Sequence, residues 1–249
     1  MVLSADIDRP VDEEVMMPNA DASSQQSKMI DLVVPVPAPT VRAHLSEFED
    51  DSVRRLLLRQ SGKDVLPNGW KEGPHSNGIQ VYHGEVADNS WNTMMTTGKL
   101  AVSAEKAMRV LVNPDYVPKY DEMTATVRVL EVLSEATQIR LVSCKSVMFT
   151  GARDFCVATT VRKEASGRIV IATRSVEHPE GVQSGYVRAL SYISGYILTP
   201  DPTNPDACEI AVLAHMDLGG YMPAMVINYV GLSAPIKLVE KIHEVTLAA

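Results

Sequence analysis

The chain has few cysteines, no excess of basic residues and no long apolar run. Three cysteines in 249 residues, Cys144, Cys156 and Cys208, are too few and too widely spaced for a disulfide framework or a zinc knuckle, so a reducing, cytoplasmic compartment is expected. Lysine and arginine number 23 against 31 acids, and the net charge of −8 argues against nucleic acid as a partner. No apolar run could span a bilayer, so any membrane contact should be transient and peripheral.

The N-terminal segment lacks the basic start and apolar stretch of a signal peptide, and Val2 stands where myristoylation needs glycine. It is acidic and without periodicity, and it ends in Pro35, Pro37 and Pro39, which favour extended backbone. We therefore predict a disordered leader over residues 1–39 and one monomeric domain over residues 40–249.

Two helices are predicted in the first half of the domain. Thr40 is a suitable N-cap for a helix that runs to Ser61, since apolar residues recur at helical spacing between them. A second, shorter helix should begin after Ser103 and end at Asn113-Pro114.

Alternation with a period of two predicts strands through most of the remaining chain. Strands are expected at 79–82 and 91–102, and then at 126–133, 138–147, 155–163, 169–176, 187–198 and 208–216. Their short, polar separations predict a meandering antiparallel sheet.

The last segment returns to helical spacing, with an apolar stripe formed by Met222, Met225, Val226, Tyr229, Leu232, Ile236 and Val239. Burying this stripe contributes about 10–20 kcal/mol, at roughly 1.5–3 kcal/mol per side chain. A helix with such a face must cover the sheet, so the fold class is predicted to be α+β.

Features of an enzyme are sparse. The six histidines show no HxxxH or HxH spacing, and neither a G-x-S-x-G elbow nor a glycine-rich phosphate loop is present. We therefore predict no enzymatic activity, no catalytic residues, no metal and no cofactor.

A series of short motifs carries the most information. Arg153-Asp154-Phe155 is followed by Val187-Arg188, by Gly195-Tyr196 with Pro200, and by Asp217-Leu218-Gly219-Gly220 just before the last helix. This order, over about residues 66–245, resembles that of START domains, the lipid-binding modules related to the steroidogenic acute regulatory protein.

The resemblance implies a helix-grip fold, in which a curved antiparallel sheet wraps around the long C-terminal helix and encloses a lipid in an internal cavity. It implies a mobile gate loop at the cavity mouth, here including Met148, Phe149, Thr150 and Gly151. Arg153 and Asp154 are expected to be structural. The implied partner is a lipid: a phospholipid, a fatty acyl lipid or a sterol.

The chain departs from the pattern of sterol-binding START members, which carry an acid on the strand before the triplet and an arginine six positions after the triplet's own arginine. Thr159 stands at the second position, and the preceding strand carries Arg140 and Lys145 without an acid. A phospholipid or other acyl lipid is therefore expected in preference to a sterol. The predicted cavity residues are Arg140, Cys144, Met148, Thr159, Arg188, Tyr192, Met216, Met222, Met225 and Tyr229.

Two alternatives to a lipid carrier stay open at this point. The related helix-grip scaffold also hosts cyclases and hydrolases, for which His215 or Glu209 would be the candidate base. The domain could instead be a lipid-sensing regulatory module whose acidic leader contacts a protein partner.

Overall fold

A computed structural model describes residues 34–87, 89–147, 150–220 and 234–249. Its helices are α2 (Ala38–Ala43), α3 (Leu45–Gln60), α4 (Ala104–Val112), α5 (Val117–Tyr120) and α7 (Ala234–Ala248). Its strands are β1 (Val36–Pro37), β2 (Leu66–Ser76), β3 (Ile79–Val86), β4 (Asn89–Leu100), β5 (Thr124–Val132), β6 (Thr137–Cys144), β7 (Arg153–Lys163), β8 (Ile169–Glu177), β9 (Val187–Arg188), β10 (Leu190–Pro200) and β11 (Cys208–Asp217).

The strands form one sheet, in the order β2-β3-β4-β11-β10-β8-β7-β6-β5, with every neighbouring pair on this path antiparallel. Two short strands depart from the meander: β1 runs parallel to β8, and β9 runs parallel to β7. The predicted antiparallel sheet is confirmed, although β2 and α5 had not been predicted.

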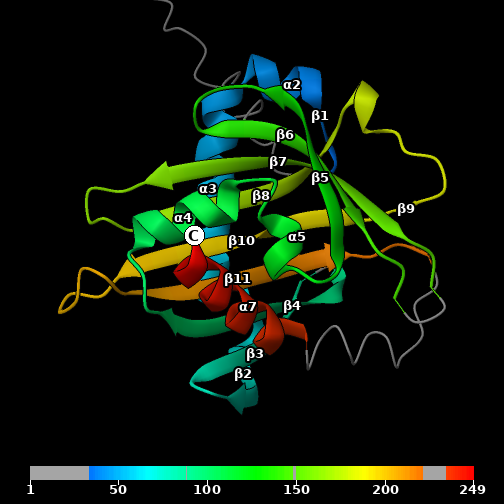
Figure 1. Cartoon of the computed structure of the whole chain (residues 1–249). Coiled ribbons are helices and arrows are strands. Elements are labelled where there is room, and N and C mark those ends of the chain that lie inside the picture. The colour runs from blue at the N-terminus through cyan, green and yellow to red at the C-terminus, as the bar shows by residue number, and fades with distance from the viewer. Residues whose placement is uncertain (1–33, 88, 148–149, 221–233) are drawn as a thin grey trace, which may run out of the picture. The chain divides into compact units, whose positions relative to one another are not determined.

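Helices cover both faces of the sheet. Helix α3 lies behind it and α4, α5 and α7 lie in front, as Figure 1 shows. Helix α2 lies at the top of the picture, and its Val41 packs in the same cluster as Phe48 of α3. Alternate residues of one strand therefore enter different layers: Ile171 packs in the cluster of the front helices, whereas Val170 and Ala172 pack with Leu56 of α3.

The residues just before Thr40 are already part of the fold. Val36 and Ala38 are only 2% and 0% exposed, so the predicted leader boundary at residue 39 falls inside the fold. Pro37 occupies the N-cap position of α2 and Pro39 lies in its first turn, where a missing N–H costs no helical hydrogen bond. The first helix therefore starts earlier than predicted. It is also divided at His44, whose backbone is not helical, into α2 and α3.

The helix after Ser103 is confirmed as α4. The Ser103 side chain accepts a hydrogen bond from the Lys106 amide at 3.3 Å, which satisfies one of the free donors of the first turn. The helix ends at Asn113, as predicted.

The described part of the C-terminal helix, α7, packs with Val239 and Ile242 in the same core cluster as Leu100. A Cβ at Gly98 of β4 would come within 3.0 Å of Val239 Cγ1, so the glycine allows the helix to approach the sheet closely. The predicted stripe residues Met222, Met225 and Tyr229 lie outside the described residues. None of the described helices is both long and apolar enough to cross a membrane.

Candidate functional site

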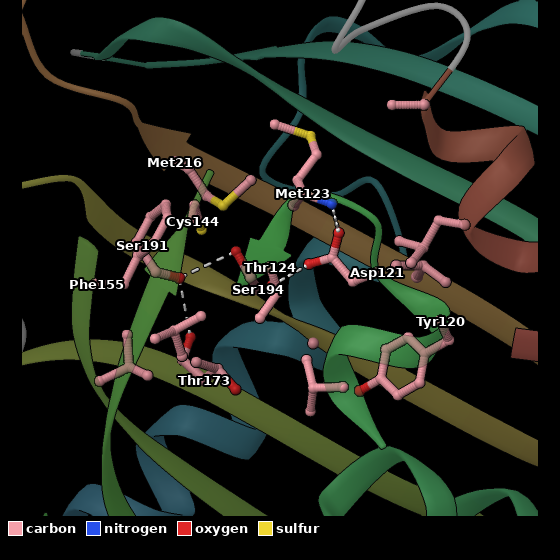
Figure 2. Close-up of a pocket in the computed structure, with 18 of the residues that line it drawn as sticks. Tyr120, Asp121, Met123, Thr124, Cys144, Phe155, Thr173, Ser191, Ser194 and Met216 are labelled. Atoms are coloured by element: carbon pink, nitrogen blue, oxygen red, sulfur yellow. Dashed lines mark hydrogen bonds between the residues drawn. The ribbon is translucent and has the colours of Figure 1, made fainter. Parts of the chain in front are cut away.

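A cavity of about 330 Å³ lies on the front face of the sheet, next to α5 and the start of α7 (Figure 2). It is lined by side chains from strands β4 to β8, β10 and β11. Most of its wall is apolar. The apolar residues that line it include Val127, Val142, Phe155, Val157, Val212 and Met216.

A group of hydroxyls crosses three neighbouring strands on the cavity wall. Thr159 Oγ1 and Thr173 Oγ1 are 3.2 Å apart, and Ser191 Oγ lies 3.0 Å from Ser194 Oγ and 3.3 Å from the Thr173 carbonyl (Figure 2). Since these hydroxyls bond to one another and to the backbone, they can line an apolar cavity without the full penalty of unpaired polar groups.

An acidic group lies between α5 and β5. Asp121 accepts hydrogen bonds from Thr124 Oγ1 at 2.5 Å and from the Met123 amide at 3.0 Å (Figure 2). Burial raises the pKa of Asp121 despite these bonds. Burial, with the nearby charge of Asp121, also raises the pKa of Cys144 to about 12, so this cysteine stays a thiol and acts as an apolar wall residue.

Arg140 is a buried cation of the wall, at 7% exposure. Its Nη2 donates to the Val112 carbonyl at 2.6 Å and to Gln138 Oε1 at 3.1 Å, while its buried Nε has no hydrogen-bond partner among the described residues. Burial lowers the pKa of Arg140, and Tyr120 and Tyr196 lie close enough to oppose that shift.

Arg153 joins two segments at the other end of β7. Its guanidinium donates through Nη1 to the Gly151 carbonyl and through Nε to the Leu218 carbonyl at 3.4 Å. One side chain thus holds the predicted gate loop to the turn that precedes the C-terminal helix. Thr150 and Arg153 both line the cavity, whereas Met148 and Phe149 lie outside the described residues.

Asp154 points to the opposite face and binds Arg188. Its carboxylate accepts from Arg188 Nε and Nη2, each at 2.9 Å, in a bidentate pair. Arg188 also donates to the Gly181 carbonyl. Arg153 and Asp154 thus each bond to another segment of the chain, as residues that anchor a loop would. Their structural role stays a prediction.

The structure brings four of the predicted cavity residues together on the wall: Arg140, Cys144, Thr159 and Met216. Arg188 and Tyr192 lie elsewhere. Arg188 is held by Asp154 because β9 runs parallel to β7 and places the two side chains side by side. Tyr192 is turned away by a register shift between Ser191 and Ile193, and its ring lies 4.8 Å from that of His215.

The two candidate bases are not among the residues that line the cavity. His215 is 3% exposed, with Nε2 3.1 Å from the Trp91 carbonyl, and Glu209 is exposed on β11. Among the residues that the structure describes, no group of three or more His, Cys, Asp or Glu side chains is placed to hold a metal ion.

Several wall residues had not been predicted as site residues, including Tyr120, Thr173, Ser191, Ser194 and Tyr196. Strand alternation could have found most of them, because side chains two positions apart on a strand share a face. Thr173 lies two positions after Ile171, and Tyr196 lies two positions after Ser194, all four on the wall. Ser191 breaks this alternation because of the register shift next to it.

Comparisons with known proteins agree with this architecture. A family model described as "START domain" matches residues 58–244. Mouse StAR-related lipid transfer protein 5 is 23% identical over 185 residues, which cover 72% of this chain and 85% of the relative. Steroidogenic acute regulatory-like protein 1 of Caenorhabditis elegans is 26% identical over 166 residues, 65% of this chain and 63% of that protein.

The structure of human StAR-related lipid transfer protein 5 aligns with a TM-score of 0.75 at 18% identity, covering 83% of this chain and 98% of that chain. This likeness confirms the predicted helix-grip fold. Because the family model also spans most of the sequence, the chain belongs to the START domain family.

Proposed function

We propose that the protein binds one lipid molecule in the cavity and carries it between membranes. The observation that supports this most strongly is the largely apolar cavity between the sheet and α7, in a chain that belongs to the START family. Two relatives with this family's sequence pattern are named as lipid transfer or steroidogenic regulatory proteins.

The magnitude of the hydrophobic effect explains why such a cavity is useful. Moving an acyl chain of about 16 carbons from a membrane into water costs on the order of 13 kcal/mol, at about 0.8 kcal/mol per methylene. A protein cavity that replaces the bilayer removes most of this cost, and the unbranched thioethers of Met94 and Met216 adapt to chains of different shape.

The ligand is a phospholipid or another acyl lipid rather than a sterol. Thr159, at the position where sterol binders are expected to carry an arginine, bonds to Thr173 instead, and β6 offers Arg140 in place of an acid. The protein works as a monomer in the cytoplasm, in keeping with Cys144, Cys156 and Cys208 being free thiols.

Native mass spectrometry of the protein purified from its own cells, followed by liposome transfer assays with labelled phospholipid, fatty acid and sterol, tests this function. One bound lipid per chain and transfer of an acyl lipid are expected. Failure to bind or transfer any class would overturn the proposal, and tight cholesterol binding that displaces phospholipid would overturn the choice of lipid.

A cavity-filling variant shows whether the lipid occupies this cavity. Ala214 lines the cavity from β11, so Ala214→Trp should abolish stoichiometric lipid binding while the fold is retained. The matched control is Glu209→Trp, at an exposed position of the same strand, which should leave binding unchanged. Full lipid loading of the folded Ala214→Trp protein would place the ligand elsewhere.

A further inference from the structure

No carboxylate of the described residues balances the charge of Arg140. Arg59 and Arg174 are buried to a similar degree, at 6% and 1% exposure, and each bonds to a carboxylate: Asp64 at 2.9 Å and Asp51 at 2.7 Å. For Arg140, by contrast, no carboxylate lies within 4.0 Å among the described residues, and its hydrogen-bond acceptors are a carbonyl and an amide.

A buried cation without a counter-charge is costly, because desolvation is not repaid by an ion pair. Asp121, an acid that lines the cavity, bonds to Thr124 and to the Met123 amide, and the cation whose charge stabilises its carboxylate is Lys145. Arg140 therefore keeps both a positive charge and a free Nε donor at the cavity wall.

The position of Arg140 along β6 indicates which end of the cavity is charged. Cys144 of β6 pairs with Arg153, next to the gate loop, whereas Arg140 pairs with Val157, four residues further along. Four residues of strand span about 13 Å. Apolar wall residues Val142 and Phe155 lie between the two ends, so the guanidinium is at the end of the cavity away from the loop.

We infer that the ligand carries an anionic oxygen head group, a carboxylate or a phosphate, and that this head enters first and accepts a hydrogen bond from Arg140 Nε. The acyl chain then runs along Val142 and Phe155 toward Thr150 and Leu218. This inference rests on the proposed function, since it names the charge and orientation of the lipid in the same cavity. A neutral head would leave the buried cation unpaired, which is the basis of selectivity.

Binding of three probes with the same chain length tests the inference: palmitate, 1-palmitoyl lysophosphatidate and hexadecanol, each titrated into the full chain at pH 8. At least one anionic probe should bind about tenfold or more tightly than hexadecanol, and comparison of the two anions tells carboxylate from phosphate. Equal binding of all three would overturn the inference and leave lipid binding standing. Binding of none of them, nor of the lipid classes above, would overturn the proposed function itself.

Substitutions test whether Arg140 is the residue that causes the preference for anionic probes. Arg140→Met should remove the preference for the anionic probe and retain hexadecanol binding, whereas the control Arg128→Met, at an exposed site on β5, should keep the preference. Lys145→Met removes a second cation that lines the cavity, next to Cys144 at the loop end of β6. If the preference depends on Lys145 and not on Arg140, the head group lies near the loop and the inferred orientation is wrong.

A measurement on the unaltered protein covers the case in which Arg140→Met does not fold. The carboxyl resonance of [1-¹³C]palmitate bound to the wild-type protein should stay constant between about pH 8 and pH 5, because an ion-paired carboxylate has a lowered pKa. A resonance that titrates like that of palmitate at a membrane surface would show a solvated head and overturn the inference.

Discussion

Arg174 of β8 donates from Nη1 to Asp51 Oδ2 of α3 over 2.7 Å, with the arginine side chain 1% exposed and the carboxylate 13% exposed. Asp51 also accepts from Arg55 Nε at 2.7 Å. Although burial alone would raise its pKa, the hydrogen bond from Arg55 and the charges of Arg55 and Arg174 lower the pKa of Asp51 below its ordinary value. This pair fixes α3 to the sheet face opposite the cavity.

Asp51→Asn should therefore lower the free energy of unfolding by about 3 kcal/mol, because it removes the negative charge that the buried Arg174 guanidinium binds. Urea unfolding followed by circular dichroism measures this. The matched control is Asp50→Asn, whose ion pair with Arg162 is exposed and should change stability by less than about 1 kcal/mol. Equal effects of the two substitutions would show that the buried pair does not anchor α3.

Arg153→Ala should lower the free energy of unfolding by about 1–3 kcal/mol, because the carbonyls of Gly151 and Leu218 lose their shared donor. Lipid transfer should fall only to the extent that the protein loses stability. Arg162→Ala, on the solvated part of the same strand, serves as the control. A variant with an unchanged melting temperature and no ligand binding would instead make Arg153 a direct lipid contact.

His215 should make stability depend on pH. Burial, and then the charge of Arg59, lower the pKa of His215 to about 4, with Asp64 opposing the shift. Between about pH 6.5 and pH 4 the unfolded chain takes up a proton that the folded chain does not, so stability falls as the pH falls through this window, by up to about 3 kcal/mol.

The comparison of wild type with His215→Gln isolates this contribution. Between pH 7 and about pH 4.5 the wild type should lose about 2–3 kcal/mol more than the variant, measured by urea unfolding at each pH. Identical pH profiles would show that the imidazole is protonated in the folded protein as readily as in the unfolded chain.

Ligand entry should require the gate loop to separate from the turn before the C-terminal helix, since Arg153 bridges Gly151 and Leu218 across this boundary. Cysteines at Thr150 and Leu218, in a background without Cys144, Cys156 and Cys208, can be joined by a short bismaleimide. The crosslinked protein should retain its lipid and stop transferring it. Full transfer by protein whose crosslink is confirmed by mass would place the entrance elsewhere.

Local patterns determined much of the architecture. Ser103 placed the start of α4, because N-capping depends on residues within one turn. Alternation predicted most of the long strands, because period two is a property of each strand by itself. The order of motifs around Arg153 and Asp217 pointed to the family, and with it to a cavity over the sheet.

The tertiary structure decided which side chains enter that cavity. The register shift at Ser191 turned Tyr192 toward His215, and one residue of slip is enough to change the face of a side chain. The parallel pairing of β9 with β7 placed Arg188 next to Asp154, to which it bonds. The sequence shows Arg140 as a cation on a strand. That no described carboxylate pairs with it depends on segments far apart in sequence, which only packing brings together.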